Sequence, residues 1–481
     1  MKKLLFSVFF TLLLSALVFA GGQQEEGSKE AVKKKIIIDG GGGIVQFNST
    51  KSMEKTDANP YPYNELETLC TEWEAIHPEY EVEILDQSYG GGSDKIIPLL
   101  AGRKAPDLLF TLTINAADLG GKGWFLPLDE YYDKPNPYIE GNKKWKDIFV
   151  PSWFDAMSFP DGHIYSVPLD HIPIGIIYNK DIFEKAGISS LPESFGELME
   201  TQKKISDAGF IPYFPLYVWY DIFLEGSLFA DLLPQIDVLR PDGWSDAEEI
   251  VRAYKKGIWE VDGVRNREYF RMLKEKTKYY PEGWQSFDAF GNFLQGKVAM
   301  MEGVGIHLRM TRDDQQREFN FGYMPYPLVT KEDSPFGGKG IVRGSAGYSS
   351  TWFLTNSAKE KGTVDGAIDL MMFLTEPSNN ARLVNTLEAM MPASLDAEVS
   401  PLFEPLVDKA VEDMNNDFCD WHVFNSWGYL GSEYYEFFLQ LVQKYELSQI
   451  TIDEALAQLA EQTEYTVEEM IQKNNWDTSA W

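Results

Sequence analysis

Cysteine and histidine are scarce in this chain, and both shortages limit its chemistry. The 481 residues include two cysteines, Cys70 and Cys419, and five histidines. Two cysteines in distant segments allow one disulfide at most, and we expect both to be buried structural thiols. The histidines show no H-E-x-x-H or other paired spacing, so we expect no metal site and no cofactor.

Motifs for covalent catalysis are missing as well. No G-x-S-x-G elbow or comparable nucleophile motif occurs in the sequence, and we therefore expect no catalytic residue. The 74 acidic residues bring some carboxylates together by chance, so composition alone leaves glycosidase chemistry open. No motif supports that chemistry.

Basic residues are too few to balance the acidic ones. Lys and Arg number 43 against 74 Asp and Glu, which gives a net charge of −31. Such a surface repels nucleic acid and anionic lipid headgroups, so we predict no nucleic-acid partner. Aromatic residues are frequent, at 14% of the chain. Exposed aromatic faces are one means by which proteins hold the apolar faces of sugar rings.

The long apolar run of the sequence lies at its start. Lys2 and Lys3 precede apolar residues 4–17, and Val18-Phe19-Ala20 fits a signal-peptidase site. The run is shorter than the roughly 20 residues of a membrane anchor, which makes a retained anchor the weaker alternative. We predict a cleaved signal peptide over 1–20, a disordered tether over 21–35 and a periplasmic protein. No cysteine lies near the cleavage site, which argues against a lipoprotein.

Strand and helix patterns alternate through the rest of the chain. About 445 residues follow the tether, too many for one compact core, so two lobes are expected. Short apolar runs predict strands, and 3.6-residue periodicity predicts helices between them. This order is typical of an α/β fold with helices on both faces of each sheet. Strands are predicted at 35–39, 80–85, 106–110, 174–178, 297–301 and 321–324, and helices at 66–76, 96–101, 181–186, 192–208, 367–374 and 433–473.

Several segments, in order, carry a resemblance to a known family. Tyr178–Ile188 and the helix start at Leu191–Leu198 resemble the extracellular solute-binding proteins of the maltose-binding, family 1 type. Four further stretches and a terminal helix start fall in the same order as in that family. They are Leu100–Asp107, Asp161–Pro168, Phe293–Met300, Phe373–Pro377 and Thr451–Leu456.

The resemblance implies a fold and a function. It implies a two-lobed periplasmic-binding-protein-like fold of type II, each lobe a sheet flanked by helices, with hinge strands between the lobes. By position, the lobes should comprise 36–168 plus 302–346 and 169–301 plus 347–481. The crossings should lie near 168–173, 301–305 and 344–350. The implied function is capture of a carbohydrate by a monomer, for delivery to the transmembrane subunits of an ABC importer.

Candidate ligand contacts in the first lobe follow its strands, because ligands of open α/β sheets sit beyond the carboxyl ends of strands. Gly40–Gly43 could approach a ligand closely, and no Gly-Lys-Ser/Thr follows to make a phosphate loop. The hydroxyl and amide side chains here could instead make ordinary loop hydrogen bonds. The candidates are Gln46, Asn48, Tyr89, Thr111, Thr113 and Asn115.

Candidates at the hinge and in the second lobe include carboxylates and aromatic rings. Asp170 could accept hydrogen bonds from sugar hydroxyls or belong to a hinge salt bridge. Trp219 and Asp221 form an aromatic–acid cluster, although Trp219 could pack in the core. At Glu302-Gly303 the family commonly has a stacking Trp shortly after the Gly, and here none follows. The stacking role would then fall to Trp284 or Trp427.

Two alternatives of function stay open. The solute could be a peptide or a polyamine rather than a sugar. The protein could instead be an exported carbohydrate-active enzyme.

Overall fold

The chain is described by a computed structural model. The structure describes residues 33–42, 45–46, 50, 52–57, 59, 62–85, 93–112, 119, 122–155, 157–159, 161–216, 219–241, 245–338, 343–415 and 430–481. The predicted signal peptide and nearly all of the predicted tether lie outside these ranges. The tether was expected to reach residue 35, but strand β1 already begins at Lys34.

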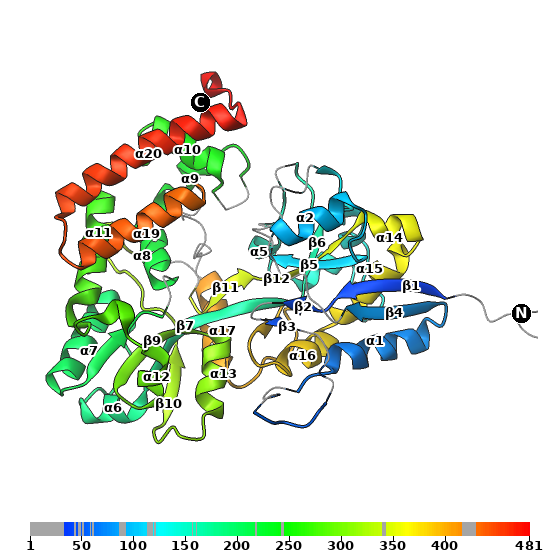
Figure 1. Ribbon diagram of the computed structural model, residues 1–481, viewed down its shortest axis with the longest axis horizontal. Coiled ribbons are helices and arrows are strands. Elements are labelled where there is room, and N and C mark those ends of the chain that lie inside the picture. The colour runs from blue at the N-terminus through cyan, green and yellow to red at the C-terminus, as the bar shows by residue number, and fades with distance from the viewer. Residues whose placement is uncertain are drawn as a thin grey trace, which may run out of the picture.

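The first sheet has five strands in the order β4-β1-β5-β12-β6 (Figure 1). β1 runs parallel to β4 and β5, and β12 runs antiparallel to β5 and β6. Its strands are β1 (Lys34–Asp39), β4 (Tyr80–Leu85), β5 (Leu108–Leu112), β6 (Ser166–Pro168) and β12 (Ser350–Leu354), and a separate hairpin joins β2 (Gly41–Gly42) to β3 (Val45–Gln46).

Helices α1, α15 and α16 pack together beside this sheet, and the apolar face of each contributes to its core. Pro377 begins α16, as its fixed φ allows at a helix start. The helices that belong to this part of the chain are α1 (Glu65–Ile76), α2 (Ser93–Ala101), α4 (Asp129–Tyr132), η2 (Trp145–Ile148), α5 (Pro151–Asp155), α14 (Asn356–Lys361), α15 (Val364–Leu374) and α16 (Pro377–Asn385).

The second sheet has six strands built around β7. Its main order is β10-β7-β9-β8, and β11 and β13 pair with the first half of β7. β8 and β9 are parallel, whereas β7 is antiparallel to β9 and β10. The strands are β7 (Asp170–Asn179), β8 (Ile211–Phe214), β9 (Val298–Val304), β10 (Phe321–Met324), β11 (Ser345–Tyr348) and β13 (Met391–Pro392).

Local capping signals set the starts of helices around the second sheet. Ser194 and Glu197 form a complete capping box at α7, and Thr451 and Glu454 form another at α20. These helices and turns are α6 (Lys180–Lys185), α7 (Phe195–Asp207), α8 (Trp219–Phe229), η3 (Ala230–Leu232), α9 (Leu233–Ile236), α10 (Ala247–Lys255), α11 (Val264–Lys276), η4 (Thr277–Tyr279), η5 (Trp284–Ser286), α12 (Ala289–Leu294), α13 (Gly305–Asp313), α17 (Glu404–Asn415), α19 (Ser432–Glu446), α20 (Ile452–Asn474) and η6 (Thr478–Ala480).

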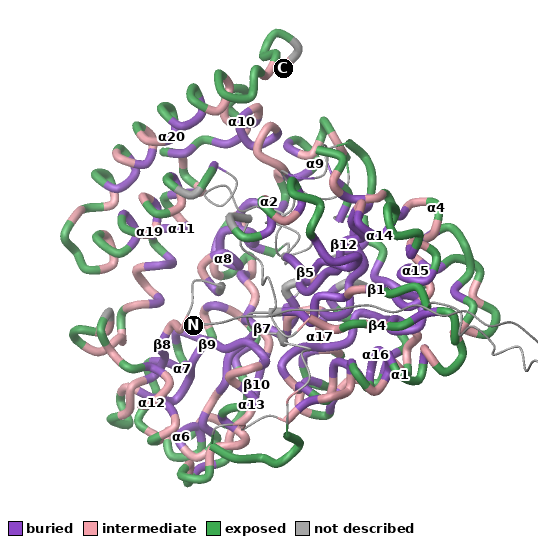
Figure 2. Tube along the Cα trace, turned by 45° about the vertical axis from the view of Figure 1, so that its right-hand side comes forward, coloured by how far each residue is buried: buried purple, intermediate pink, exposed green. Residues whose placement is uncertain are grey.

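Each sheet has a large apolar core of its own. One cluster of buried side chains surrounds β1, β5 and β12, and another surrounds β7, β8 and β9. Figure 2 shows buried residues concentrated along the strands of both sheets. Two mixed sheets, each flanked by helices and each with its own core, confirm the predicted α/β, two-lobed class.

The chain passes between the two sheets at short connections. Leu169 alone separates β6 from β7, and Ser349 alone separates β11 from β12. Both crossings lie in predicted hinge regions. The expected crossing at 301–305 is wrong, because β9 is a buried inner strand that leads into α13, and α13 packs on β7 and β9. The third connection is at β13, which pairs with the start of β7.

Strand pairing also differs from the expected division of the later chain. Residues 302–346 were assigned to the first lobe, yet β10 pairs with β7 in the second sheet. Residues 347–481 were assigned to the second lobe, yet β12 pairs with β5 and β6 in the first. All five residues of β12 pair with β5, and this pairing places β12 in the first sheet. The local sequence pattern of β12 carries no information about which strand it pairs with.

Candidate functional site

A pocket of about 340 Å³ opens at the carboxyl end of β8. β8 and β9 are parallel, so their carboxyl ends share one edge of the second sheet, where ligands of α/β folds bind. We call it the α8–α19 pocket, and α11 and η5 complete its walls. It is lined by Pro215, Leu216, Asp221, Tyr269, Lys276, Trp284, Phe438, Leu439, Gln440, Val442, Gln443 and Glu446.

The α8–α19 pocket contains a buried ion pair. The side chain of Lys276 is 1% exposed, and its Nζ forms an ion pair with Asp221 on α8. Burial alone would lower the pKa of the Lys276 ammonium, but Asp221, Glu302 and Glu446 outweigh it, and the pKa is raised. Lys276 is therefore held in its charged form by surrounding carboxylates.

Two further carboxyl groups lie beside this pair. Glu302 on β9 is fully buried, and Tyr213 OH donates to its Oε1 at 2.6 Å. Burial raises the pKa of Glu302, and Asp221 adds to the rise while Lys276 opposes it. Burial and Asp221 likewise raise the pKa of Glu446. Three acidic side chains thus surround one ammonium, and two of them, Asp221 and Glu446, line the pocket.

Aromatic rings line the α8–α19 pocket or pack against those that do. Trp284 is partly exposed and lies edge-on to Tyr280, with ring centroids 5.4 Å apart. Phe214, the last residue of β8, lies 6.4 Å from Trp284. On the α19 side, Phe438 stacks on Tyr269 at 6.3 Å. Of the rings that line the pocket, Trp284 is partly exposed, whereas Tyr269 and Phe438 are buried. A partly exposed ring next to hydrogen-bonding groups suits a ligand with an apolar face and polar edges.

Helical periodicity explains why two charged residues point into this pocket. The buried positions of α11 include Tyr269, Leu273 and Lys276, at the spacing of one helix face. Glu446 follows buried Val442 by four residues on α19. Sequence reasoning missed Lys276 and Glu446. In the sequence, each of the two is a charged residue among apolar residues that recur along one face of a helix.

Three predicted residues come together here. Asp221 and Trp284 line the α8–α19 pocket, and Glu302 interacts with Asp221 and Lys276. Gly303, next to Glu302, lies within β9 opposite Gly175. A Cβ atom at Gly303 would meet Ile177 Cδ1 at 2.7 Å, so the residue makes room within the sheet.

Asp170 and Thr111 lie elsewhere. Asp170 is fully buried at the start of β7, and its Oδ1 accepts from Ser350 N at 2.9 Å, across the boundary between the two sheets. Burial raises the pKa of Asp170 to about 7. Its neighbour His171 contacts Ser345 Oγ at 2.8 Å, and burial lowers the pKa of His171 to about 3. Thr111 is buried in β5, and its carbonyl accepts from Thr351 Oγ1.

The remaining predicted contacts lie outside what the structure describes. Asn48, Tyr89, Thr113, Asn115 and Trp427 fall in undescribed segments, as does Cys419. Gln46 in β3 and Trp219 at the start of α8 are described for their backbone only. Cys70 is a buried free thiol, as predicted.

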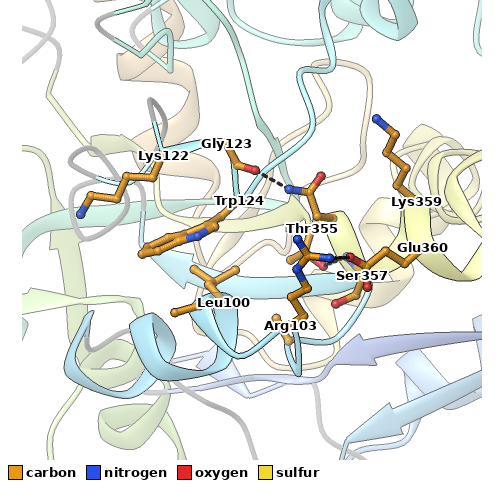
Figure 3. A pocket seen from close by; sticks show the side chains of 12 residues that line it. Leu100, Arg103, Lys122, Gly123, Trp124, Thr355, Ser357, Lys359 and Glu360 are labelled. Carbon is orange, nitrogen blue, oxygen red and sulfur yellow. Dashed lines mark hydrogen bonds and ion pairs between the residues drawn. The ribbon is translucent and has the colours of Figure 1, made fainter.

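A second pocket, of about 540 Å³, lies on the first lobe between the end of α2 and the start of α14 (Figure 3). Arg103 and Glu360 form an ion pair across it at 2.8 Å, and Trp124 lies beside Leu100. Lys122 and Lys359 are exposed at its rim. None of the residues predicted to contact a ligand lines this pocket, whereas two of them line the α8–α19 pocket.

The described ranges contain no metal-binding cluster and no helix suited to span a membrane. No group of three or more His, Cys, Asp or Glu side chains there is arranged to hold a metal ion. No described helix combines the length and apolar character needed to cross a membrane.

Comparisons with known proteins agree on one family. The family profile of the bacterial extracellular solute-binding proteins matches residues 58–381. The sn-glycerol-3-phosphate-binding periplasmic protein UgpB of Yersinia enterocolitica is 22% identical over 320 residues, which cover 65% of this chain and 67% of that protein.

Solved structures share the fold. Maltose-bound MalE3 of T. maritima has a TM-score of 0.59 at 18% identity, covering 90% of this chain and 99% of that one. UgpB of Mycobacterium tuberculosis in complex with glycerophosphocholine has a TM-score of 0.60 at 13% identity, covering 91% of this chain and 99% of that one.

Proposed function

This chain belongs to the bacterial extracellular solute-binding protein family, and from that premise we propose that it captures a carbohydrate for an ABC importer. The carbohydrate binds between the two lobes, which close around it, and the closed monomer docks on the transmembrane subunits. Residues 1–20 direct the protein to the periplasm as a signal peptide and are then cleaved off. It binds its solute without turnover.

One observation supports this proposal most: the composition of the α8–α19 pocket. Partly exposed Trp284 offers a face to the C–H side of a sugar ring, and Asp221, Gln440 and Gln443 offer polar partners for hydroxyls. Every hydroxyl buried without a partner would cost about 1–3 kcal/mol, so a sugar site needs this mixture. A maltose-bound protein shares the fold.

The first lobe would supply the other half of the site. Gln46, Asn48, Tyr89, Thr111, Thr113 and Asn115 are the proposed partners there. Trp219 and Trp427 are proposed as further rings from the second lobe. Asp170, at the crossing from β6 to β7, lies where a ligand contact and lobe closure would be coupled.

A thermal-shift screen of neutral mono- to tetrasaccharides tests the proposal. A ligand at 100 times its Kd adds about 2.7 kcal/mol to the stability of the folded protein, which raises the unfolding midpoint. We expect at least one saccharide to raise the midpoint. A rise with peptides or polyamines alone would contradict carbohydrate capture. Mass spectrometry of the bound saccharide after incubation checks for cleavage, and turnover would contradict a pure binding role.

Two tryptophan variants locate the site once a ligand is found. Trp284→Ala should raise the Kd about tenfold, because loss of a stacking ring costs roughly 1–1.5 kcal/mol. Trp124→Ala is the matched control, since Trp124 is also partly exposed but lines the first-lobe pocket. Equal effects of the two variants on calorimetric Kd would remove the α8–α19 pocket from the site.

A further inference from the structure

We propose that the α8–α19 pocket receives a protonated amino group of the solute, with Glu446 as its carboxylate partner and Trp284 as the adjoining aromatic wall. The inference rests on the proposed function and specifies it, because it makes the ligand an amino-bearing saccharide. Nothing in the family assignment selects between neutral, acidic and amino-bearing solutes.

The α8–α19 pocket offers a ligand no free Lys or Arg side chain among its described lining residues. Lys276 is the only Lys or Arg among the described residues that line it, and its ammonium is already paired with Asp221. Its side chain is 1% exposed, so it cannot turn toward a ligand. A phosphate or carboxylate on the solute would enter without the Lys or Arg partner that such groups require.

The start of α8, where a helix could bind an anion, is already occupied by the carboxyl group of Glu302. Helix N-termini attract anions through their free N–H groups and dipole. Here a backbone hydrogen bond from Tyr220, in the first turn of α8, goes to the buried carboxyl of Glu302. The protein therefore places its own acid where a solute anion would otherwise be held.

The carboxylate of Glu446 is attracted by Lys276 and Lys274 from a distance but is not paired with either. Among the described residues no Lys, Arg or His side chain forms an ion pair with it. The nearby Lys274 directs its Nζ to the backbone of Glu446 and to Ser448 Oγ instead. Burial and the neighbouring Asp221 disfavour a negative charge on Glu446, and a solute cation would relieve both effects.

Trp284 and Glu446 together line both the α8–α19 pocket and an adjoining hollow of about 680 Å³. Arg271, Lys274 and Lys278 also line the adjoining hollow, so a cation is favoured within the α8–α19 pocket, where Lys276 is the only Lys or Arg among the described lining residues. There Glu446 and Trp284 offer a carboxylate and an indole ring, the combination that binds ammonium groups in proteins. The sugar ring attached to the ammonium group could extend within the pocket or into the adjoining hollow.

Calorimetry with matched sugars tests the inference. The probes are glucose, glucosamine and glucuronate, the same three forms of galactose, and glycerol 3-phosphate, each titrated into the mature protein at pH 7.5. We expect the amino member of one series to bind at least tenfold more tightly than its neutral parent, and the acids not to bind. Equal or tighter binding of the neutral or acidic member overturns this inference and leaves carbohydrate capture standing. If none of these sugars binds, and no saccharide of the thermal-shift screen binds either, both this inference and carbohydrate capture are overturned.

Variants assign the role to Glu446. Glu446→Gln keeps the shape and removes the charge, so the preference for the amino sugar over its neutral parent should fall at least fivefold. Glu436→Gln is the matched control, because Glu436 is exposed on the same helix and outside the pocket. An unchanged preference in Glu446→Gln overturns the assignment.

A pH series gives an independent readout. Asp221 on α8 and Lys274 and Lys276 on α11 act on Glu446 and set its ionisation. The other charged residues that line the adjoining hollow with it are Arg271, Glu275, Lys278 and Glu282. Affinity for the amino sugar should pass through a maximum, because it rises as Glu446 loses its proton and falls as the sugar's ammonium, like an α-amino group, loses its own near pH about 7.7–8.0. Affinity for the neutral parent should show no such maximum. Parallel pH profiles overturn the ammonium–carboxylate pairing.

Discussion

The ammonium of Lys276 lies on an apolar face of α11, where burying a lone charge would be strongly unfavourable. Asp221 pairs with it directly, and Glu302 and Glu446 add longer-range attraction. The four groups therefore depend on one another for stability. Removing the single cation leaves three carboxyl groups crowded together in a poorly solvated space.

Lys276→Met should accordingly lower the free energy of unfolding by about 3–5 kcal/mol, the usual cost of breaking a buried ion pair on one side. Urea denaturation at pH 7 measures the change. Lys203→Met is the control, because Lys203 forms an exposed pair with Asp207 on α7 and should have no measurable effect. Similar losses in both variants would contradict the buried network.

Asp170 makes stability depend on pH in a direction opposite to that of most carboxylates. Its pKa is raised to about 7 in the folded protein, against an unfolded value of about 3.9. The folded state therefore holds its proton more tightly, so the contribution is full below about pH 4 and is lost as pH rises toward 7. The expected loss is on the order of 1–4 kcal/mol.

Asp170→Asn should remove this loss, since the amide oxygen can still accept from Ser350 N. Relative to the parent, the variant should gain stability between pH 5 and pH 8 in urea denaturation. Parallel stability curves for the two proteins across that range would show that Asp170 does not titrate there.

At the scale of elements, the sequence predicted those whose signals are local. The helix predicted at 192–208 and the strand predicted at 80–85 correspond to α7 and β4, whose signals come from neighbours along the chain. In the structure Ser194 and Glu197 cap α7. β7 was expected only from Ile174, because residues 168–173 were assigned to a crossing between the lobes. In the structure β7 already begins at Asp170, because β11 and β13 pair with its first half.

Partner choice was the part that local patterns could not supply. The pairing of β12 with β5 joins residues about 240 positions apart, and nothing in either strand specifies the other. The same limit applies to the site. Asp221 and Trp284 could be proposed one by one, but their meeting with Lys276 and Glu446 depends on how α8, α11 and α19 pack.

The pairing of β7 with β9 yields a prediction about Gly303. A Cβ atom there would overlap Ile177, and one at its partner Gly175 would lie 2.4 Å from Met324 O. Gly303→Ala should therefore lower the free energy of unfolding by about 1–3 kcal/mol, through overpacking. Ligand affinity of the folded fraction should stay unchanged. Weaker calorimetric binding without loss of stability would instead make Gly303 a direct ligand contact.

At the scale of the whole molecule, two separate cores joined by short crossings allow rigid lobes to move. Each sheet packs its own apolar cluster, while the connections at Leu169 and Ser349 are single residues. Such an arrangement permits hinge bending without loss of core contacts. A strongly negative net charge favours solubility.

Ligand binding should therefore make the molecule more compact. In small-angle scattering the radius of gyration should fall toward the roughly 22 Å of a compact protein of this length when saturating ligand is added. A sugar that leaves the thermal midpoint unchanged should leave the radius unchanged. Trp284→Ala should shift the transition to higher ligand concentration without altering its end point, because the ring stabilises the complex and not the hinge. A constant radius at full saturation would mean that the solute binds a preformed site, and hinge closure would then have no part in recognition.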